Sequence, residues 1–595
     1  MLGFEKLSHW TGLRGRSGRN RMHKPGAGRP VESSADEQAD PQRVLTRETP
    51  GDPLFVALEP EVQPQALSDL GALWRELLDL FGRDLTVHGF EDQEPAEQIL
   101  IHGIADHSRK VTTGDVFFAV SGVERDGAQF VDEALAGGAV AIVADHVLGA
   151  VTSRSVPLFV VPDTRLAVAR IAAVYHGEPS RKLPVIGVTG TNGKTTVTDL
   201  LSLCLEDDSR QVGSLGTLHY RLGPACPSNR EDSDTIERIE PVEKVVAATN
   251  TTPGPVALQA YLSEMLDRGV RAAVIEVSSH ALDQGRTDWV HFDAAVFTNL
   301  SQDHLDYHGN MEAYGKAKAR LFEKLVPGSL AVIPNDEPSA SYIFEHLPQG
   351  VRLVTYGFGA ATHKDAYHVR GRILENDLGG IRFTVETEEG SAEVQLPLVG
   401  VHNVRNALAA LATAIGMGVG TLRAADALSR AKPVLGRLER MDTGEGEFAI
   451  FVDYAHTPDA LGQVLEALRP MTCGRLRVLF GCGGDRDRGK RPMMGAIARR
   501  LADVVIVTDD NPRTEDAAAV RAEVMEGCAS PRAESDLKEI GGRRAAIRAA
   551  VAGLAPGDVL VVAGKGHEQG QIVGGEVLPF DDVTEARTAV LGETG

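Results

Sequence analysis

The stretch Gly187-Val-Thr-Gly-Thr-Asn-Gly-Lys-Thr-Thr196 decides the fold, because it joins two segments of different periodicity. The run before it, Leu183–Val188, is short and apolar, as in a buried strand, and the apolar residues after it recur at helical spacing. A glycine-rich turn between a strand and a helix presents backbone N–H groups and the positive end of the helix dipole to an anion. The sequence therefore predicts a phosphate-binding loop in an α/β domain with a mostly parallel sheet.

Two side chains of this loop have predicted roles at a nucleoside triphosphate. Lys194 would reach the β- and γ-phosphates, and the Thr195 hydroxyl would bind Mg²⁺. The spacing departs from the common GxxxxGK[ST] pattern, since Val188 stands where that pattern has its first glycine. The predicted ATP-binding residues of the loop are Gly190, Thr191, Asn192, Gly193, Lys194, Thr195 and Thr196.

Polar residues also follow two further strand-like runs, Ala272–Val277 and Ala294–Phe297. Glu276 lies at the end of the first, and Asp303-His304 follows the second. Ligands of open α/β sheets bind at the carboxyl ends of the strands. We therefore expect Glu276 and His304 to be metal ligands beside the triphosphate.

A lysine-rich segment, Met311–Phe322, has the periodicity of a helix. Its lysines have the spacing of a solvated face. Spacing alone gives no reason to choose Lys318 over Lys316.

Four strand-like runs in the last third of the chain each end in polar residues: Phe448–Val452, Leu476–Phe480, Val504–Val507 and Val559–Val562. The carboxyl ends of parallel strands meet at one edge of a sheet, so these four ends predict a single binding face. A dinucleotide-binding loop after the second run is disfavoured, because Arg486 stands where GxGxxG requires its last glycine.

Composition indicates a globular protein of several domains. The chain has 595 residues, 43% of them apolar, and no apolar run approaches the roughly 18 residues that a membrane span needs. Its net charge of −22 argues against a general nucleic-acid surface. The five cysteines form no CxxC pair, as expected of reduced thiols in the cytoplasm. We expect a cytoplasmic protein with small-molecule partners.

Residues 1–62 differ from the rest of the chain. A Gly- and Arg-rich stretch is followed by an acidic one, and neither holds enough apolar surface to offset the entropy of ordering. We expect a disordered extension. A bacterial extension is the favoured interpretation, and an organellar transit peptide is the alternative.

Eight blocks of sequence together resemble the Mur ligase family of peptidoglycan synthesis. They are GTNGKTT, NTTPG, EVSSHAL, TNLSQDHLDYHG, VDYAHTPDAL, GCGGDRDRGKRPMMG, TDDNPRTED and GKGHE, and the resemblance covers residues 85–595. It implies three domains: a uridine-nucleotide domain over 63–180, a central ATPase domain over 181–433, and a Rossmann-like amino-acid domain over 434–595.

The resemblance also implies the reaction. A member of this kind adds meso-2,6-diaminopimelate to UDP-N-acetylmuramoyl-L-alanyl-D-glutamate through an acyl phosphate, releasing ADP and phosphate. ATP is the co-substrate and Mg²⁺ the cofactor, and we expect a monomer. The sequence leaves the stereoisomer of diaminopimelate open.

Site residues are implied position by position. The implied catalytic residues are Lys194, Glu276, His304 and Lys318, with Lys318 carried as a carbamate that binds metal together with Thr195, Glu276 and His304. Further ATP contacts are Asn403, Arg437, Asp453 and His456. The implied contacts of the muramoyl dipeptide nucleotide are Ser108, Thr251, Thr252, Ser278, Gln284 and Arg286. The implied contacts of diaminopimelate are Arg486, Asp510, Asn511, Pro512, Arg513, Gly564 and Glu568. The sequence departs from the family at Val123-Glu124, where some members have His-Gln.

Other interpretations stay open. A lysine-adding ligase of the same family would use the same chemistry, although Arg513 suits a substrate with a distal carboxylate. Folylpolyglutamate synthase is a more distant relative that the DNPR and GKGHE blocks do not fit. A non-catalytic scaffold derived from such an enzyme is the third alternative, and the retained Lys194, Glu276, His304 and Lys318 argue against it.

Overall fold

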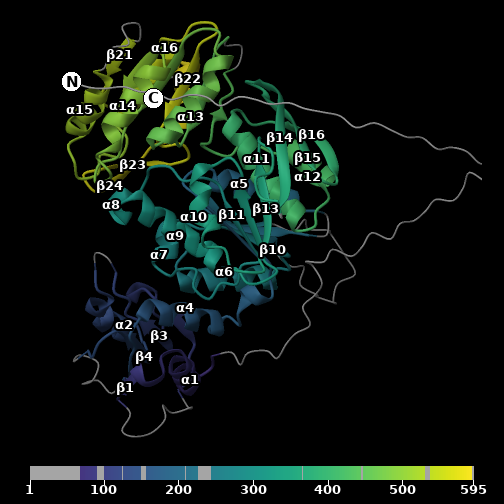
Figure 1. The fold of residues 1–595 in the computed structure, drawn as a ribbon. Coiled ribbons are helices and arrows are strands. Elements are labelled where there is room, and N and C mark those ends of the chain that lie inside the picture. Colours follow the sequence, from purple (N-terminus) through teal and green to yellow (C-terminus); the bar gives the residue numbers. More distant parts are fainter. Residues whose placement is uncertain are drawn as a thin grey trace, which may run out of the picture. The chain divides into compact units, whose positions relative to one another are not determined.

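The computed structural model describes residues 67–89, 99–122, 125–148, 156–207, 210–224, 243–364, 366–443, 447–529 and 536–592. They all lie within one unit, Asp52–Gly595. The expected extension 1–62 and the pair Val123-Glu124 lie outside the described residues. Strands of three sheets alternate with helices along the chain (Figure 1), as the predicted α/β class requires.

The first sheet has the order β1-β5-β4-β3-β2 and is parallel except at β1–β5. Its strands are β1 Thr86–His88, β2 Gly103–Ala105, β3 Asp115–Phe118, β4 Ala141–Ala144 and β5 Leu158–Val160, and its helices are α1 Leu70–Phe81, α2 Val131–Ala136 and α4 Thr164–Tyr175. Short 3₁₀ turns are η1 Gly82–Asp84, η2 Ser108–Lys110, η3 Gly127–Phe130 and η4 Pro179–Arg181. Helix α1 begins where the Asp69 carboxylate accepts a hydrogen bond from the Ala72 amide at 2.9 Å.

The second sheet has eleven strands in the order β16-β15-β14-β13-β12-β11-β6-β10-β7-β8-β9, and its middle, from β14 to β7, is parallel. The strands are β6 Val185–Thr189, β7 Val212–Leu215, β8 His219–Pro224, β9 Glu243–Ala247, β10 Ala272–Glu276, β11 Ala294–Phe297, β12 Leu330–Pro334, β13 Arg352–Gly357, β14 Tyr367–Asp377, β15 Gly380–Thr387 and β16 Gly390–Leu396. The helices are α5 Lys194–Leu205, α6 Pro255–Asp267, α7 Ser279–Asp283, α8 Leu305–His308, α9 Met311–Glu323, α10 Ser341–Phe344, α11 Val401–Gly416 and α12 Thr421–Ser429, with a 3₁₀ turn, η5, at Pro338–Ala340.

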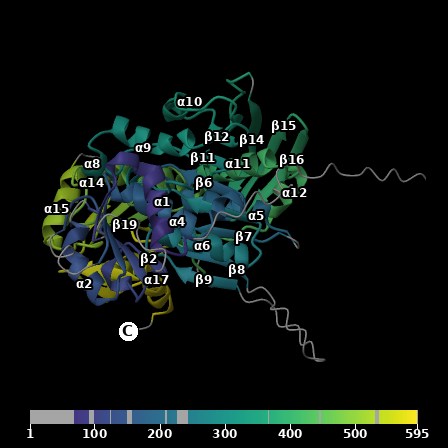
Figure 2. The same cartoon turned by 90° about the horizontal axis from the view of Figure 1, so that it is seen from below.

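Strand β6 is buried on both faces, which explains its continuous apolar run. Ile186 and Val188 belong to a core formed with α5, α11 and α12, three helices that pack together in Figure 2. Val185 belongs to a second core on the opposite face, formed with α6 and α9. The strand that precedes the phosphate loop is therefore fixed by packing from both sides, and the loop starts from a rigid base.

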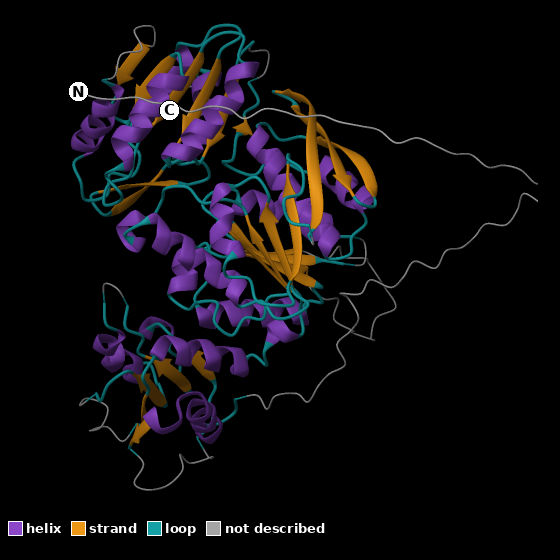
Figure 3. Cartoon of the chain, in the orientation of Figure 1, coloured by secondary structure: helices purple, strands orange, loops and turns teal. Residues whose placement is uncertain are grey.

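The third sheet has the order β17-β18-β22-β19-β20-β21 and is parallel except at β17–β18. Its strands are β17 Glu439–Arg440, β18 Ala449–Asp453, β19 Leu476–Phe480, β20 Val504–Val507, β21 Asp536–Glu539 and β22 Val559–Ala563, and a separate hairpin comprises β23 Gly570–Val573 and β24 Glu576–Pro579. The helices are α13 Pro458–Leu468, α14 Lys490–Leu501, α15 Ala517–Cys528, α16 Arg543–Ala552 and α17 Asp582–Leu591, with a 3₁₀ turn, η6, at Arg469–Met471 (Figure 3).

The four predicted strand ends of the last third do lie side by side. Strands β18, β22, β19 and β20 are consecutive neighbours and all parallel, so their carboxyl ends share one edge. Among the described residues, no helix combines the length and the apolar character that crossing a membrane needs.

Candidate active site

The phosphate loop between β6 and α5 is shaped by two glycines. Gly190 has φ 152° and Gly193 has φ 86°. A Cβ at Gly190 would lie 1.8 Å from the Thr298 hydroxyl oxygen, and one at Gly193 would lie 2.4 Å from the Asn406 side-chain oxygen. Neither position has room for a side chain, so glycine is required for the loop to pack against the end of β11 and against α11.

Lys194 reaches back over this loop. Its Nζ donates hydrogen bonds to the carbonyl oxygens of Gly190 and Thr191, both at 2.9 Å. Burial lowers the pKa of Lys194, although the nearby Glu276 carboxylate opposes the shift. The ammonium is thus held over the loop, the position from which it would meet a triphosphate.

Thr195 and Glu276 form an oxygen-rich cluster beside the loop. The Thr195 hydroxyl donates to Glu276 Oε2 at 3.1 Å. Thr217 donates to the same carboxylate through its amide, at 2.9 Å to Oε1, and through its hydroxyl, at 3.0 Å to Oε2. Hydroxyl and carboxylate oxygens are the ligand types that Mg²⁺ prefers, so the pair fits the predicted metal.

His304, immediately before α8, has a left-handed φ of 53°. Burial lowers its pKa to about 4, so the imidazole is neutral near pH 7 and has a lone pair for a ligand. Its Nε2 is 3.3 Å from the Asp303 carboxylate, which also lies 4.0 Å from His456 Nε2. The sequence analysis did not single out Asp303, although it immediately precedes a predicted ligand.

The structure separates the two lysines that spacing left equivalent. Lys318 is 1% exposed, and its Nζ donates to the Gly190 carbonyl oxygen at 2.8 Å. Burial lowers the pKa of Lys318 well below its ordinary value, and the charge of Lys194 lowers it further. Lys316, by contrast, is exposed and paired with Glu312 at 2.7 Å. Only Lys318 lies at the phosphate loop.

One cavity of about 220 Å³ collects nearly all of the predicted ATP residues. Those that line it are Thr191, Asn192, Gly193, Lys194, Thr195, Thr196, Asn403, Arg437, Asp453 and His456. Thr251, Glu276 and His304 line it as well, whereas Gly190 and Lys318 lie outside its lining. Asn192 donates to Asp459 Oδ2 at 2.9 Å, which ties the phosphate loop to α13 of the third sheet.

Asp453, at the end of β18, is committed to the backbone. Its two oxygens accept from the Leu438 amide at 2.6 Å and the Ala455 amide at 2.7 Å. Burial raises its pKa, and these amides and Arg437 oppose the shift. Asp453 thereby fixes the turn that carries Arg437 into the cavity wall.

Three other predicted ATP contacts, Arg437, His456 and Asn403, are also held in place by neighbouring groups. The Arg437 guanidinium lies over the Tyr454 ring, 4.5 Å from its centroid. His456 Nδ1 is 2.8 Å from the Tyr454 carbonyl oxygen. The Asn403 amide donates to the Val399 carbonyl oxygen at 2.8 Å. A stacked arginine and an imidazole offer flat surfaces next to the loop.

Four of the predicted dipeptide contacts form one cluster. Arg286 donates through Nε and Nη2 to Gln284 Oε1, at 3.0 and 2.7 Å, and through Nη1 to the Thr252 carbonyl oxygen at 3.1 Å. Ser278 donates its amide to the Thr252 hydroxyl at 3.0 Å. Within the described part of the chain, Arg286 has only neutral acceptors, so its charge is left for an anionic ligand.

The hydroxyls of Ser108 and Thr251 have hydrogen-bond partners outside that cluster. The Ser108 hydroxyl, in η2, donates to Glu133 Oε2 at 2.6 Å. The Thr251 hydroxyl is 3.1 Å from that of Thr217, at the edge of the cavity. Asp106, two residues before Ser108, approaches the NTTPG block, because a Cβ at Gly254 would lie 3.2 Å from Asp106 Oδ2.

The predicted amino-acid contacts of the third sheet meet around a lysine that the sequence analysis missed. Lys565 is fully buried, and its Nζ donates to Asn511 Oδ1 at 2.9 Å and to Glu568 Oε2 at 2.8 Å. Asp510 Oδ1 lies 3.7 Å from the same Nζ and has no hydrogen-bond partner in the part of the chain that the structure describes. Its position in the sequence between two predicted contacts, Gly564 and Glu568, could have identified Lys565 as part of the site.

Gly564 and Pro512 let these strand ends approach closely. Gly564 has φ 112°, and its amide donates to the Asp453 carbonyl oxygen at 3.0 Å. The Pro512 carbonyl oxygen lies so near Gly484 that a Cβ there would be 1.9 Å away. Both contacts are made by backbone atoms.

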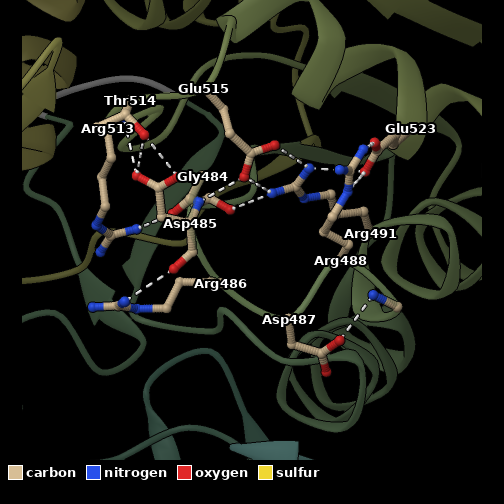
Figure 4. A network of polar contacts seen from close by, with 12 residues as sticks. Gly484, Asp485, Arg486, Asp487, Arg488, Arg491, Arg513, Thr514, Glu515 and Glu523 are labelled. Atoms are coloured by element: carbon tan, nitrogen blue, oxygen red, sulfur yellow. Dashed lines mark hydrogen bonds and ion pairs between the residues drawn. The ribbon is translucent and has the colours of Figure 1, made fainter. Parts of the chain in front are cut away.

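Arg486 and Arg513 complete this edge (Figure 4). Arg513 Nη1 donates to the Gly484 carbonyl oxygen at 2.7 Å, and Arg486 Nη1 donates to the Asp485 carbonyl oxygen at 3.0 Å. Neither guanidinium is ion-paired to a carboxylate within the ranges that the structure describes. Burial lowers the pKa of Arg513, and the like charge of Arg486 lowers it further.

Comparison with protein families agrees with this geometry. The chain matches the model of the Mur ligase middle domain over residues 188–414 and that of the Mur ligase glutamate ligase domain over 436–566. Residues 100–176 match the model described as Mur ligase family, catalytic domain. The three matches cover the three sheets in order.

Individual relatives give the same result. UDP-N-acetylmuramoyl-L-alanyl-D-glutamate–2,6-diaminopimelate ligase of Geobacillus thermodenitrificans is 40% identical over 489 residues, or 81% of this chain and 93% of the relative. The protein of that name from Mesorhizobium japonicum is 43% identical over 492 residues, 82% of this chain and 95% of the relative.

A solved structure of a ligase of the same name is 34% identical, with a TM-score of 0.56 over 84% of this chain and 97% of that one. Folylpolyglutamate synthase of Mycobacterium tuberculosis shares the fold alone, at 19% identity, a TM-score of 0.52 and coverage of 72% of this chain. With three domain models matched in order and relatives above 40% identity along most of its length, the chain belongs to the Mur ligase family.

Proposed function

We propose that this protein is an ATP-dependent ligase that joins 2,6-diaminopimelate to UDP-N-acetylmuramoyl-L-alanyl-D-glutamate in peptidoglycan precursor synthesis. The choice of amino acid rests on Arg486 and Arg513. Both guanidinium groups donate hydrogen bonds to backbone carbonyl oxygens, and neither is ion-paired to a carboxylate among the described residues. Diaminopimelate has a second carboxylate that lysine lacks, and a guanidinium is the donor that suits it.

The carboxylates around Lys565 support the same choice. Asp510 Oδ1 has no hydrogen-bond partner among the described residues, and Glu568 is the second carboxylate next to Lys565. Either group would receive the ammonium that lies next to the distal carboxylate of the substrate. The edge therefore offers positive and negative groups in the combination that an amino-acid zwitterion needs.

In the first step of the proposed reaction, an oxygen of the D-glutamate γ-carboxylate attacks the γ-phosphorus of ATP. The new O–P bond forms as the bond to the β-phosphate oxygen breaks, and ADP leaves. Lys194, already over the loop, would stabilise the charge of the transferring phosphoryl group. Arg286, with only neutral described acceptors, would hold the anionic dipeptide.

In the second step, the amine of diaminopimelate attacks the acyl carbon and phosphate leaves with its oxygen. The amine loses a proton, and an amide is formed. The acyl phosphate has to be kept from water during this exchange. The hydrogen bond from Asn192 to Asp459 would help to hold the third domain against the phosphate loop during this exchange.

The residues present fit Mg²⁺. Thr195, Glu276 and His304 would hold it, together with Lys318 if that residue is carbamylated. The bound ion would supply charge neutralisation between the carboxylate and the triphosphate. Among the described residues, no three His, Cys, Asp or Glu side chains gather as a metal site, so the hydroxyl and the modified lysine are part of the proposal.

Burial supports the proposed modification of Lys318. Only a neutral amine attacks carbon dioxide, and burial lowers the pKa of Lys318 strongly. A new N–C bond would form, a proton would leave the nitrogen, and the product would be an anionic carbamate. Its oxygens could bind a metal ion, which the unmodified ammonium, with no lone pair, cannot do.

The test is ligation by the full chain. Purified protein with ATP, Mg²⁺, the muramoyl dipeptide nucleotide and diaminopimelate should release ADP and phosphate and form the tripeptide nucleotide in equal amounts. Lysine in place of diaminopimelate should react more slowly by orders of magnitude, since a closed site leaves one arginine unpaired. Equal use of lysine would favour the lysine-adding alternative, and no turnover would favour the scaffold.

The remaining expectations are part of this proposal. They are the domain bounds at residues 62, 180 and 433, a cytoplasmic location and a monomeric state.

A further inference from the structure

Two loops of the third domain interlock next to the proposed diaminopimelate site (Figure 4). One follows β19 and the other follows β20. The Asp485 carboxylate accepts from the Thr514 amide at 3.0 Å and from its hydroxyl at 2.9 Å. In return, Glu515 Oε1 accepts from the Asp485 amide at 2.6 Å. We call Asp485, Thr514 and Glu515 the clasp, because each loop holds the other by a side-chain-to-backbone bond.

A buried arginine, Arg491, holds the Glu515 carboxylate of the clasp in place. Arg491, on α14, is 0% exposed and donates to both oxygens of Glu515, at 2.7 and 3.0 Å. It also donates to the Gly483 carbonyl oxygen at 3.1 Å and to Glu523 Oε2 at 2.8 Å. Among the described residues, Glu515 is therefore the carboxylate that joins Arg491 to the loop backbone at Asp485, whereas Glu523 pairs with Arg491 and with the exposed Arg488.

The clasp holds the backbone in an uncommon conformation. Asp485 has φ 51° and Arg513 has φ 53°, both in the left-handed region that non-glycine residues seldom adopt. Such residues persist where surrounding contacts fix them, often at ligand sites. Arg513 is fixed on its other side by β23, since its amide donates to the Ile572 carbonyl oxygen at 3.0 Å.

Two of the clasp residues are next in sequence to a predicted ligand of the amino acid. Arg486 follows Asp485, and Arg513 precedes Thr514. Figure 4 shows the two guanidinium groups on the same side of the clasp. Like charges repel each other, so the loops must be tied together for both groups to face one ligand. The clasp adds its bonds to two others between these loops, from Arg513 Nη1 to the Gly484 carbonyl oxygen and from the Gly484 amide to the Asn511 carbonyl oxygen.

We propose that the clasp is a specificity device: by fixing the separation of Arg486 and Arg513, it makes the site select an amino acid with a distal carboxylate. Asp485, Thr514 and Glu515 are positioning residues and do not touch the substrate. The inference rests on the proposed function and extends it to residues outside the binding site.

The chain offers a closely matched pair of variants for the test. Glu515 and Glu523 have side chains that are 23% and 22% exposed, and both pair with Arg491. Glu515→Gln and Glu523→Gln each remove one charge next to this arginine, but only the first weakens the bond to the Asp485 amide. The measurements are KM for diaminopimelate, KM for ATP, the diaminopimelate-to-lysine ratio of kcat/KM, and the thermal unfolding midpoint.

Glu515→Gln should raise KM for diaminopimelate by about tenfold and lower the selectivity ratio, while KM for ATP stays unchanged. Glu523→Gln should alter the unfolding midpoint by a similar amount and leave both KM values at the wild-type level. If the two variants changed KM for diaminopimelate equally, or if neither did, the clasp would be a structural feature only and the inference would be overturned.

Thr514 provides a second test that leaves the charges intact. Thr514→Val removes the hydroxyl that donates to Asp485 and should lower the selectivity ratio several-fold, and Thr514→Ser should restore it. A ratio that is the same in all three proteins would contradict the inference. Failure of wild-type protein to ligate diaminopimelate would overturn the proposed function itself, a different result from wild-type activity with unchanged selectivity in the clasp variants.

Discussion

The phosphate loop takes its form from consecutive residues after β6, whereas the amino-acid site takes its predicted contacts from three strand ends that are up to 82 residues apart, from Arg486 to Glu568. In the loop, the backbone and Lys194 alone define where phosphates would bind. At the amino-acid site, Lys565 and the clasp hold the proposed contacts in register.

This difference predicts two kinds of failure. A change in the loop acts on the step common to every amino acid and should abolish turnover. A change at the amino-acid site should leave the ATP step intact and alter which amine is accepted. Variants therefore distinguish the two regions. A change in the phosphate loop should lower kcat with every amino acid, and a change at the amino-acid site should raise KM for the amino acid.

The largest effect is expected at Lys194. Lys194→Met removes the ammonium that faces the triphosphate and should lower kcat by about 10³-fold with any amino acid. The measurement is ADP release under saturating substrates. If Lys194→Met slowed the ligation of diaminopimelate but not phosphoryl transfer from ATP, the assignment of the phosphate loop would be wrong.

Lys318 should be nearly as sensitive, and Lys316 provides its control. Lys318→Ala removes the proposed carbamate and should lower kcat by roughly 10³-fold while ATP still binds. Acetate or formate should restore part of the rate by supplying an oxygen ligand. Lys316→Ala, on the exposed face of the same helix, should behave as wild type. Equal behaviour of the two variants would place Lys318 among the solvated lysines.

Arg513→Ala should give an intermediate effect confined to the amino acid. KM for diaminopimelate should rise by about 100-fold, because a charge-assisted contact to the distal carboxylate is lost. KM for ATP and for the muramoyl nucleotide should stay unchanged, and discrimination against lysine should shrink. Unchanged selectivity in this variant would mean that a group other than Arg513 binds the distal carboxylate.

The smallest effect is expected at Lys565. Lys565→Gln leaves Asp510 and Glu568 without their buried cation and should raise KM for diaminopimelate by about tenfold. The exposed Lys538 on β21 is the control, and Lys538→Gln should leave all constants at the wild-type level. A rise in KM for ATP in the Lys565 variant would show that the phosphate loop and the amino-acid site do not act independently.

The strand pattern of the sequence was informative because it depends on local physics. Period-2 and apolar runs place residues at strand ends, and parallel strands bring their ends to one edge. Strands β11, β19 and β20 begin and end at the predicted residues, and β18, β22, β19 and β20 are the predicted neighbours.

Side-chain environment was the harder part to predict. Lys316 and Lys318 are two positions apart on one helix, and only packing against the phosphate loop buries one of them. Lys565, Arg491 and Glu515 were missed because their partners lie on other elements. A buried charge is recognised by what surrounds it, and spacing along the chain carries little of that information.

The sequence by itself determined the α/β class, the phosphate loop and the family, because glycine requirements, strand-to-helix periodicity and contiguous motifs are properties of short segments. Tertiary structure decided which lysine meets the loop, which carboxylates face Lys565, and that a clasp joins the two loops carrying Arg486 and Arg513. The physical reason is that burial and charge pairing arise only when distant segments pack together.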